Sequence, residues 1–176
     1  MISVVTRKHF VRVGLSACCA VVLSGCMYRF TSSVPENLRT IAVPVFENNS
    51  GFPEIDAIAT QYTLREIQRE GTFQIRSVDS AALKVLGRVL KSDLYPIAYD
   101  RNYEGRANEY RYTLTVEVTL VERSTGKVLI NAVPISANTT FLARDDMLTG
   151  AQDAYYRLSK EVGRSIVDLL LGYWAE

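Results

Sequence analysis

The cysteine at position 26 is the first residue whose type and surroundings could support specific chemistry. It follows an apolar run, residues 13–25, that ends in the small residues Ser24 and Gly25. Three basic residues precede the run: Arg7, Lys8 and Arg12. The run is shorter than the roughly 20 residues that a helix needs to span a bilayer, and its length is typical of a secretory signal. The pattern therefore predicts a signal peptide whose apolar run ends directly before Cys26.

The segment Leu23-Ser24-Gly25-Cys26 resembles a bacterial lipobox. The resemblance implies cleavage before Cys26, diacylglycerol on its sulfur and acylation of the new N-terminus, and several acyl chains anchor a protein stably. Met27 stands where lipoproteins retained at the inner membrane typically carry Asp, which favours the outer membrane. The alternative is a stray cysteine in a simple signal. We expect residues 1–25 to be the signal peptide and residues 26–39 to be the lipidated N-terminus and a polar tether.

The composition of the mature chain excludes several kinds of site. Residues 1–25 carry three of the 20 Lys+Arg, the single histidine, two of the three cysteines and no acid. Residues 26–176 then hold 17 basic and 19 acidic side chains, a net charge of −2. Zinc sites built from Cys and His, thiol nucleophiles and histidine bases are thereby excluded. The near-neutral charge argues against nucleic acid as a partner. We expect no enzyme activity and no cofactor.

The connection 94–108 is predicted to be a loop that carries the best candidate binding residues. It is long for a hairpin and contains three tyrosines and two arginines: Tyr95, Tyr99, Tyr103, Arg101 and Arg106. Long loops without secondary structure are often functional, and Tyr and Arg are enriched at binding hot spots. The alternative is a surface loop that packs on itself, in which Asp100 and Glu104 balance the arginines.

An alternating strand, Glu109–Glu122, must position this loop. Apolar side chains at every second position predict one covered face and one polar face. The apolar set is Tyr110, Tyr112, Leu114, Val116, Val118 and Leu120. A two-residue turn after the strand would pair Leu120 with Asn131. A three-residue loop with Gly126 left-handed pairs Leu120 with Ile130 and keeps the apolar faces together, so we predict this register.

Further strands are predicted at residues 40–46, 73–78, 83–93 and 128–142, and helices at residues 53–70 and from Thr149 onward. Pro44 suits the edge or end of a strand, and Gly71 should end the first helix. The expected buried stripe of that helix is Ile55, Ile58, Ala59, Tyr62 and Ile67. Thr149 with Gln152 resembles a capping box that opens the second helix. Before it, Asp145-Asp146 favour the helix dipole over a metal site.

These elements predict an α+β two-layer sandwich. Two helices pack on one face of a four- to five-stranded, mostly antiparallel sheet. We expect residues 40–176 to form a single periplasmic domain.

The topology predicts where basic side chains meet. If residues 83–93, 109–122 and 128–142 form an antiparallel meander, the loop 94–108 and residues 143–145 lie at the same end. That end would gather four cations: Arg101, Arg106, Arg144 and Lys91, the last near the end of its strand. Arginines from separated segments suit bidentate contacts with phosphate. The alternative is exposed arginines that pair locally with nearby acids, which are Asp100, Glu104, Asp145 and Asp146.

The order of motifs along the chain resembles the LPS-assembly lipoprotein family, LptE. The motifs are the lipobox, TIAVPVFENNS, QREGTFQI, KVLGRVL, PIAYD, NEYRYTLTVEVTL and TGKVL, followed by an amphipathic helix. The resemblance implies an outer-membrane lipoprotein that plugs an LptD-type β-barrel translocon for lipopolysaccharide, supports its assembly and contacts lipopolysaccharide. A polar sheet face would suit a polar barrel lumen. Phosphorylated sugars of lipopolysaccharide would then be the ligand of the basic end.

A second interpretation comes from the stretch IAVPVFENNSG. It resembles the strand and loop that open other envelope lipoproteins, including activators of peptidoglycan synthases and the curli secretion channel subunit. Those proteins have a longer polar linker or membrane-inserting strands, and neither is evident in this sequence. The alternative function is therefore an envelope lipoprotein that regulates a peptidoglycan synthase or belongs to a secretion complex.

Overall fold

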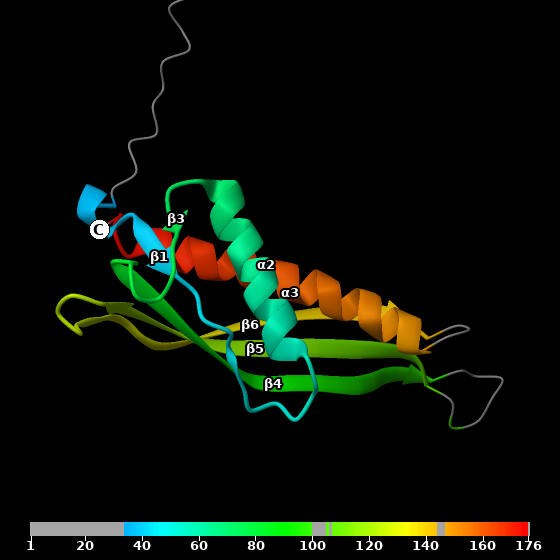
Figure 1. Ribbon diagram of the computed structural model, residues 1–176. Coiled ribbons are helices and arrows are strands. Elements are labelled where there is room, and N and C mark those ends of the chain that lie inside the picture. The colour runs from blue at the N-terminus through cyan, green and yellow to red at the C-terminus, as the bar shows by residue number, and fades with distance from the viewer. Residues whose placement is uncertain (1–33, 100–104, 106, 144–146, 176) are drawn as a thin grey trace, which may run out of the picture. The chain divides into compact units, whose positions relative to one another are not determined.

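The computed structural model describes residues 34–99, 105, 107–143 and 147–175, all within one compact unit, Ser33–Glu176. The described residues form a six-stranded sheet with two α-helices above it (Figure 1). In chain order the elements are η1 Glu36–Leu38, β1 Thr40–Ala42, β2 Glu47–Asn48, α2 Ile55–Glu70, β3 Gln74–Ile75, β4 Leu83–Tyr99, β5 Ala107–Glu122, β6 Val128–Leu142 and α3 Met147–Gly172. Val34, ahead of η1, is buried in the core.

The sheet combines a short parallel part with a long antiparallel meander. Its strand order is β3-β1-β4-β5-β6, and β2 also pairs with β4. β1 runs parallel to both neighbours, and β2 runs parallel to β4. The strands β4, β5 and β6 pair antiparallel along most of their length. The predicted fold class is confirmed, with six strands in place of four to five.

The alternation of β5 and its register with β6 agree with the sequence. Its inward side chains from Tyr112 to Leu120 are buried, and Tyr110 is half-buried. Leu120 pairs with Ile130, and Gly126 has a φ of 70°. In this turn the Gly126 N–H donates to the Glu122 carbonyl at 2.9 Å. The predicted pairing of Leu120 with Ile130 and the left-handed Gly126 are therefore confirmed. The predicted three-residue loop is wrong, because the Glu122 N–H bonds the Lys127 carbonyl and four residues, 123–126, lie between this pair. A register shift between Leu120 and Val121 accommodates the extra residue.

The strands of the meander are longer than predicted, so both predicted bounds of the loop 94–108 are wrong. β4 continues to Tyr99, and β5 already begins at Ala107, which pairs with Tyr99. Register shifts occur between Val89 and Lys91 and again after Pro96. Each bulge exchanges the positions that face inward, so a simple alternation does not extend through this part of β4.

Two other predicted strands are shorter in the structure. The segment 40–46 ends as a strand at Ala42, and the chain resumes pairing only at Glu47, because Pro44 cannot donate to a ladder. Between them Phe46 turns into the core, and its N–H donates to the Thr60 hydroxyl at 2.9 Å. The segment 73–78 pairs only at Gln74–Ile75.

Helix α2 ends as predicted but buries a different stripe. Gly71 has a φ of 86°, and its N–H donates to the Ile67 carbonyl at 3.1 Å. The buried residues are Ile55, Ala59, Thr60, Thr63, Glu66 and Ile67, whereas Ile58 and Tyr62 are half-buried. The stripe is turned toward α3 because the two helices approach closely. At the crossing a Cβ on Gly163 would lie 3.0 Å from the Thr63 nitrogen.

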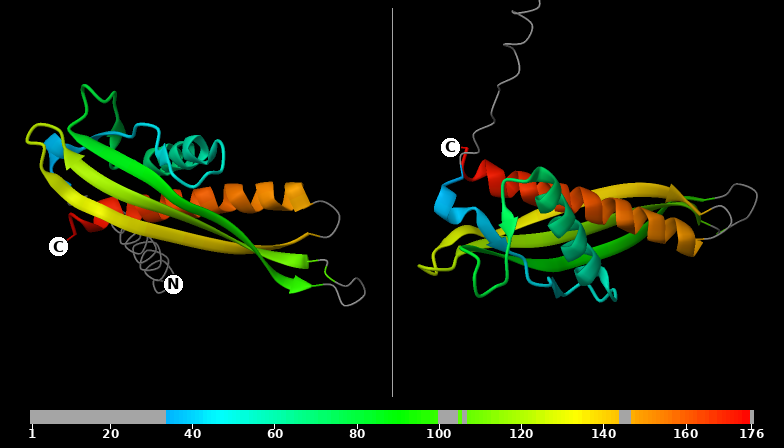
Figure 2. Two further views of the ribbon diagram at one scale, coloured as in Figure 1. Left: turned by 90° about the horizontal axis from the view of Figure 1, so that it is seen from below. Right: turned by 45° about the horizontal axis from the view of Figure 1, so that its top comes forward.

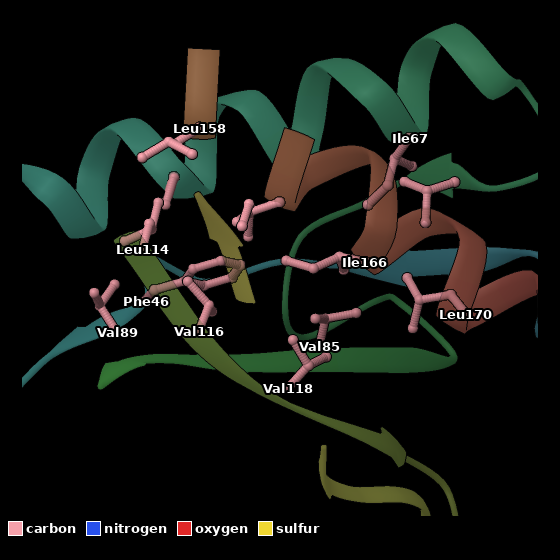
Figure 3. Packing of buried hydrophobic residues seen from close by; sticks show 14 of the residues in the cluster. Phe46, Ile67, Val85, Val89, Leu114, Val116, Val118, Leu158, Ile166 and Leu170 are labelled. Atoms are coloured by element: carbon pink, nitrogen blue, oxygen red, sulfur yellow. The ribbon is translucent and has the colours of Figure 1, made fainter. Parts of the chain in front are cut away.

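Helix α3 begins at Met147, so the predicted start at Thr149 is wrong. Its buried face consists of Ala154, Leu158, Ser159, Val162, Gly163, Ile166, Val167 and Leu170. Figure 3 shows side chains of β4 and β5 rising toward both helices, where Leu158, Ile166 and Leu170 of α3 meet them. The core thus lies between the sheet and the helix layer.

Candidate functional site

The face of β4, β5 and β6 that points away from the helices is the candidate site, and we call it the open face (Figure 2). In the described part of the chain both helices lie on the opposite side. Strand pairing arranges its side chains in four rows: Arg88-Glu117-Pro134, Lys91-Thr115-Ser136, Asp93-Thr113-Asn138 and Tyr95-Arg111-Thr140. Every member except Pro134 carries a polar group. The site is therefore a polar surface three strands wide.

Hydroxyl groups bind to one another and to the backbone across this face. The hydroxyls of Thr115 and Ser136 lie 3.1 Å apart on paired strands. The Thr119 hydroxyl accepts a hydrogen bond of 3.1 Å from the Ala132 N–H, where β6 bulges and Ala132 has a φ of 51°. Threonine suits such positions because its branched side chain fits a half-buried pleated surface. The face can offer both hydrogen-bond donors and acceptors to a partner.

One charged cluster sits at the β2 side of the open face. The Arg88 guanidinium contacts the Glu47 carboxylate at 2.9 Å and the Glu117 carboxylate at 3.2 Å. The hydrogen bond with Glu47, together with the charges of both acids, raises the pKa of Arg88 above its ordinary value. Lys91 and Arg111 form no ion pair with any described residue. Two cations are thus available to a ligand or partner.

The structure places one of the five predicted site residues. Cys26, Arg101, Arg106 and Arg144 lie outside the described residues. Lys91 is exposed on the open face opposite Thr115, in the middle of β4, so the expectation that it lies near the strand end is wrong. The prediction failed because β4 ends at Tyr99 and not at residue 93.

The described residues that flank the two basic segments do meet at one end of the sheet. Tyr99 pairs with Ala107, and Leu142 pairs with Glu109. The Ala143 N–H also donates to the Asn108 carbonyl at 2.9 Å. The topology that brings these segments together is therefore confirmed for their flanks, while contact with lipopolysaccharide stays a prediction.

Sequence reasoning missed some residues of this face. Arg88 and Arg111 were not among the predicted site residues. Tyr95 lies opposite Arg111 in the register and is 57% exposed. The alternation of β5 could have identified Arg111, because it shares a face with the threonines. The pairing of Arg88 with Glu47 could not be predicted, since it joins segments 41 residues apart.

Among the described residues, no group of three or more His, Cys, Asp or Glu side chains could hold a metal ion. Within the same part of the chain, no helix is both long and apolar enough to cross a membrane.

The fold is similar to those of solved proteins that share little sequence with it. A candidate lipoprotein from Caulobacter crescentus matches with a TM-score of 0.51 at 16% identity, over 74% of this chain and 90% of that chain. A protein from Xanthomonas campestris matches with a TM-score of 0.54 at 10% identity, over 77% and 85% of the two chains. These likenesses concern the fold alone.

A comparison with curated proteins finds no match. The model of the lipopolysaccharide-assembly family LptE, in contrast, matches residues 38–170. This range includes all six strands and most of both helices, and it covers well over half of the chain. The protein therefore belongs to the LptE family of lipopolysaccharide-assembly proteins.

Proposed function

We propose that this protein is an outer-membrane lipoprotein that plugs an LptD-type β-barrel translocon for lipopolysaccharide and supports its assembly. The family match supports a role in lipopolysaccharide assembly. The observation that supports the plug is the open face, which presents rows of polar side chains from three long strands. The lumen of a membrane β-barrel is polar. A surface that carries hydroxyls, an amide and charges of both signs can exchange hydrogen bonds with such a wall directly or through water.

The anchor follows from Cys26, which we propose is acylated and holds the protein in the outer membrane. The body would lie in the periplasm or inside the barrel lumen and act without enzyme chemistry. Mass spectrometry of the mature protein tests the anchor, and an unmodified Cys26 peptide would end this part of the proposal. In a chain exported by another signal, Cys26→Ser should release the body from membranes.

Barrel docking is tested with paired substitutions on two surfaces. Thr115→Arg combined with Ser136→Arg puts bulky charges in the row Lys91-Thr115-Ser136 of the open face. Gln61→Arg combined with Gln68→Arg adds the same charge at exposed positions of α2 and is the control. We expect the first pair to lower co-purification of the barrel by at least about tenfold and the second to leave it unchanged. Equal recovery with both folded variants would refute the open face as the docking surface.

Contact with lipopolysaccharide is the finer part of the proposal. Arg101, Arg106 and Arg144 are proposed to bind phosphate groups of its sugars, whereas Lys91, in the middle of β4, is left out of this site. Arg101→Glu combined with Arg144→Glu should weaken lipopolysaccharide binding while barrel association and folding stay intact. Unchanged binding by that folded double variant would remove this site and leave the plug unaffected.

A further inference from the structure

An apolar pocket lies on the helix-bearing side of the sheet, away from the open face. It has a volume of about 250 Å³. Its walls come from three separate segments: Phe52 and Ile58 around the start of α2, Tyr112 of β5, and Ala151, Tyr155 and Tyr156 of α3. Phe52 and Tyr156 are partly exposed, at 44% and 37%, so they stand where a ligand would enter.

The aromatic walls of the pocket contact one another. Ring centroids lie 6.4 Å apart for Phe52 and Tyr112, 6.5 Å for Tyr112 and Tyr155, and 5.5 Å for Tyr155 and Tyr156. These separations fall in the range in which aromatic pairs attract each other. Because the rings belong to a loop, a strand and a helix, the contacts join those elements around the pocket. The pocket is thus formed before any ligand arrives.

The two most buried hydroxyls of the pocket already have partners within the protein. The Tyr112 hydroxyl lies 2.8 Å from the buried Ser92 hydroxyl. The Tyr155 hydroxyl donates to the Glu54 carbonyl at 3.3 Å. Burial raises the pKa of Tyr112 and of Tyr155, so both groups stay uncharged at neutral pH. The lining also includes Glu54 and Gln152, which are exposed and place a carboxylate and an amide at the rim. The rest of the walls offers a ligand mainly ring faces and methylene groups.

The backbone at the rim holds an unusual conformation. Glu54 has a φ of 63° and a ψ of −3°, which is left-handed and uncommon for a residue other than glycine. Its carbonyl is the group that accepts the Tyr155 hydroxyl. Residues held in this region of conformational space are concentrated at binding sites. The strained residue therefore belongs to the frame of the pocket.

We propose that this pocket binds one alkyl chain of a lipid. Its volume is below the roughly 300–1,000 Å³ of pockets for drug-sized ligands, so it suits a single chain rather than a whole amphiphile. A peptide segment would bring backbone groups against walls that leave them without partners, which is unfavourable. A methylene chain loses no hydrogen bonds there, and each buried methylene strengthens binding by up to about fourfold. The proposal rests on the proposed function only for the identity of the lipid, which we infer to be lipopolysaccharide.

Photo-crosslinking of the full chain in cells tests the pocket. Photoreactive benzoylphenylalanine is placed at Tyr156, at the mouth, or at Lys160, an exposed position one turn further along α3, as the control. The adduct is identified by mass spectrometry. We expect fatty-acyl adducts at position 156 at least about tenfold above those at position 160. Adducts to protein alone, no adduct, or equal lipid adducts at both positions would overturn the proposal.

The identity of the lipid separates this proposal from the proposed function. A lipopolysaccharide adduct at position 156 supports both. A phospholipid adduct supports the alkyl-chain pocket and counts against lipopolysaccharide as the source of the chain.

Filling the pocket gives a second, independent measurement. With the probe at position 156, Ala151→Trp should reduce the lipid adduct by at least about tenfold, whereas Arg164→Trp, on the exposed surface of the same helix, should leave it unchanged. Ile58→Phe fills the pocket from α2 and replaces Ala151→Trp if the latter does not fold by circular dichroism. An undiminished lipid adduct in a folded, filled variant would overturn the proposal.

Discussion

The two faces of β5 share one backbone, but different interactions stabilise them. Val118 is fully buried beneath the helices, whereas its neighbour Thr119 is half-buried on the open face and bonds the backbone of β6. The covered face contributes to stability through apolar burial and close packing, which tolerate little change. The side chains of the open face are polar and reach water, so replacing one of them should change the free energy of unfolding only a little. We therefore expect that stability and the proposed docking can be changed separately in this sheet.

The largest expected effect is Val118→Asp, which places a carboxylate where no partner can reach it. We expect the free energy of unfolding to fall by about 4 kcal/mol or more, or folding to fail, because a buried unpaired charge is among the costliest single changes. Chemical denaturation followed by circular dichroism measures the loss. Equal stability of this variant and the wild type would refute the assignment of the covered face.

Thr119→Asp is the matched control one residue along. An aspartate oxygen can accept the Ala132 N–H that the threonine hydroxyl accepts now, so we expect a loss below about 1 kcal/mol. If this variant folds but no longer associates with the barrel, the open face is the docking surface. A loss as large as that of Val118→Asp would remove the distinction between the two faces.

An effect between those of Val118→Asp and Thr119→Asp is expected at Gly87, where the covered face leaves no room for a side chain. A Cβ there would lie 2.4 Å from the ring of Phe46, which is itself buried. Overfilling a packed core costs about 1–3 kcal/mol, so Gly87→Ala should lower the free energy of unfolding by that amount. Combined with Phe46→Leu, the loss from Gly87→Ala should shrink. Additive losses in the double variant would show that the ring is not the obstacle.

Alkaline pH should lower the free energy of unfolding through Tyr155, which lies on the helix-covered side of the sheet. Burial raises its pKa, so above about pH 10 the unfolded chain releases the phenolic proton while the folded chain retains it. Stability therefore falls as pH rises through that value, by at most about 1.4 kcal/mol per pH unit for one group and by less here because Tyr155 is partly exposed. Tyr155→Phe should flatten the fall, as urea denaturation at pH 8 to 11 would measure. An unchanged slope would contradict the raised pKa.

The sequence predicted the parts of the fold in which a single pattern runs without interruption. The alternation of β5 and the choice of Leu120 opposite Ile130 needed only a period of two and a left-handed Gly126. The pattern was lost in β4, where a bulge at Leu90 reverses which positions face inward. The same residues could not show that the strand continues to Tyr99, because bulges depend on the partner strand.

The open face and the aromatic pocket also differ in how far the sequence could predict them. The open face was implied by β5, since its threonines and Arg111 share one face of a strand. The aromatic pocket was not predicted, because the hydrogen bond between Tyr155 and Glu54 spans 101 residues and its lining depends on how α2 crosses α3. Thr63 shows the same limit: its burial follows from the close approach of Gly163 and not from the apolar periodicity of α2.

The smallest expected effect concerns Thr115 and Ser136, whose hydroxyls lie 3.1 Å apart on the open face. Cross-strand pairs of this kind contribute about 0.2–1 kcal/mol, and exposure to water places this pair at the lower end. A double-mutant cycle with Thr115→Ala and Ser136→Ala measures the coupling directly, because each change removes one hydroxyl and adds no new contact. We expect a coupling below about 0.5 kcal/mol together with a clear loss of barrel association in the double variant. A coupling well above 1 kcal/mol would mean that the open face stabilises the fold itself, and the division between a stabilising face and a docking face would fail.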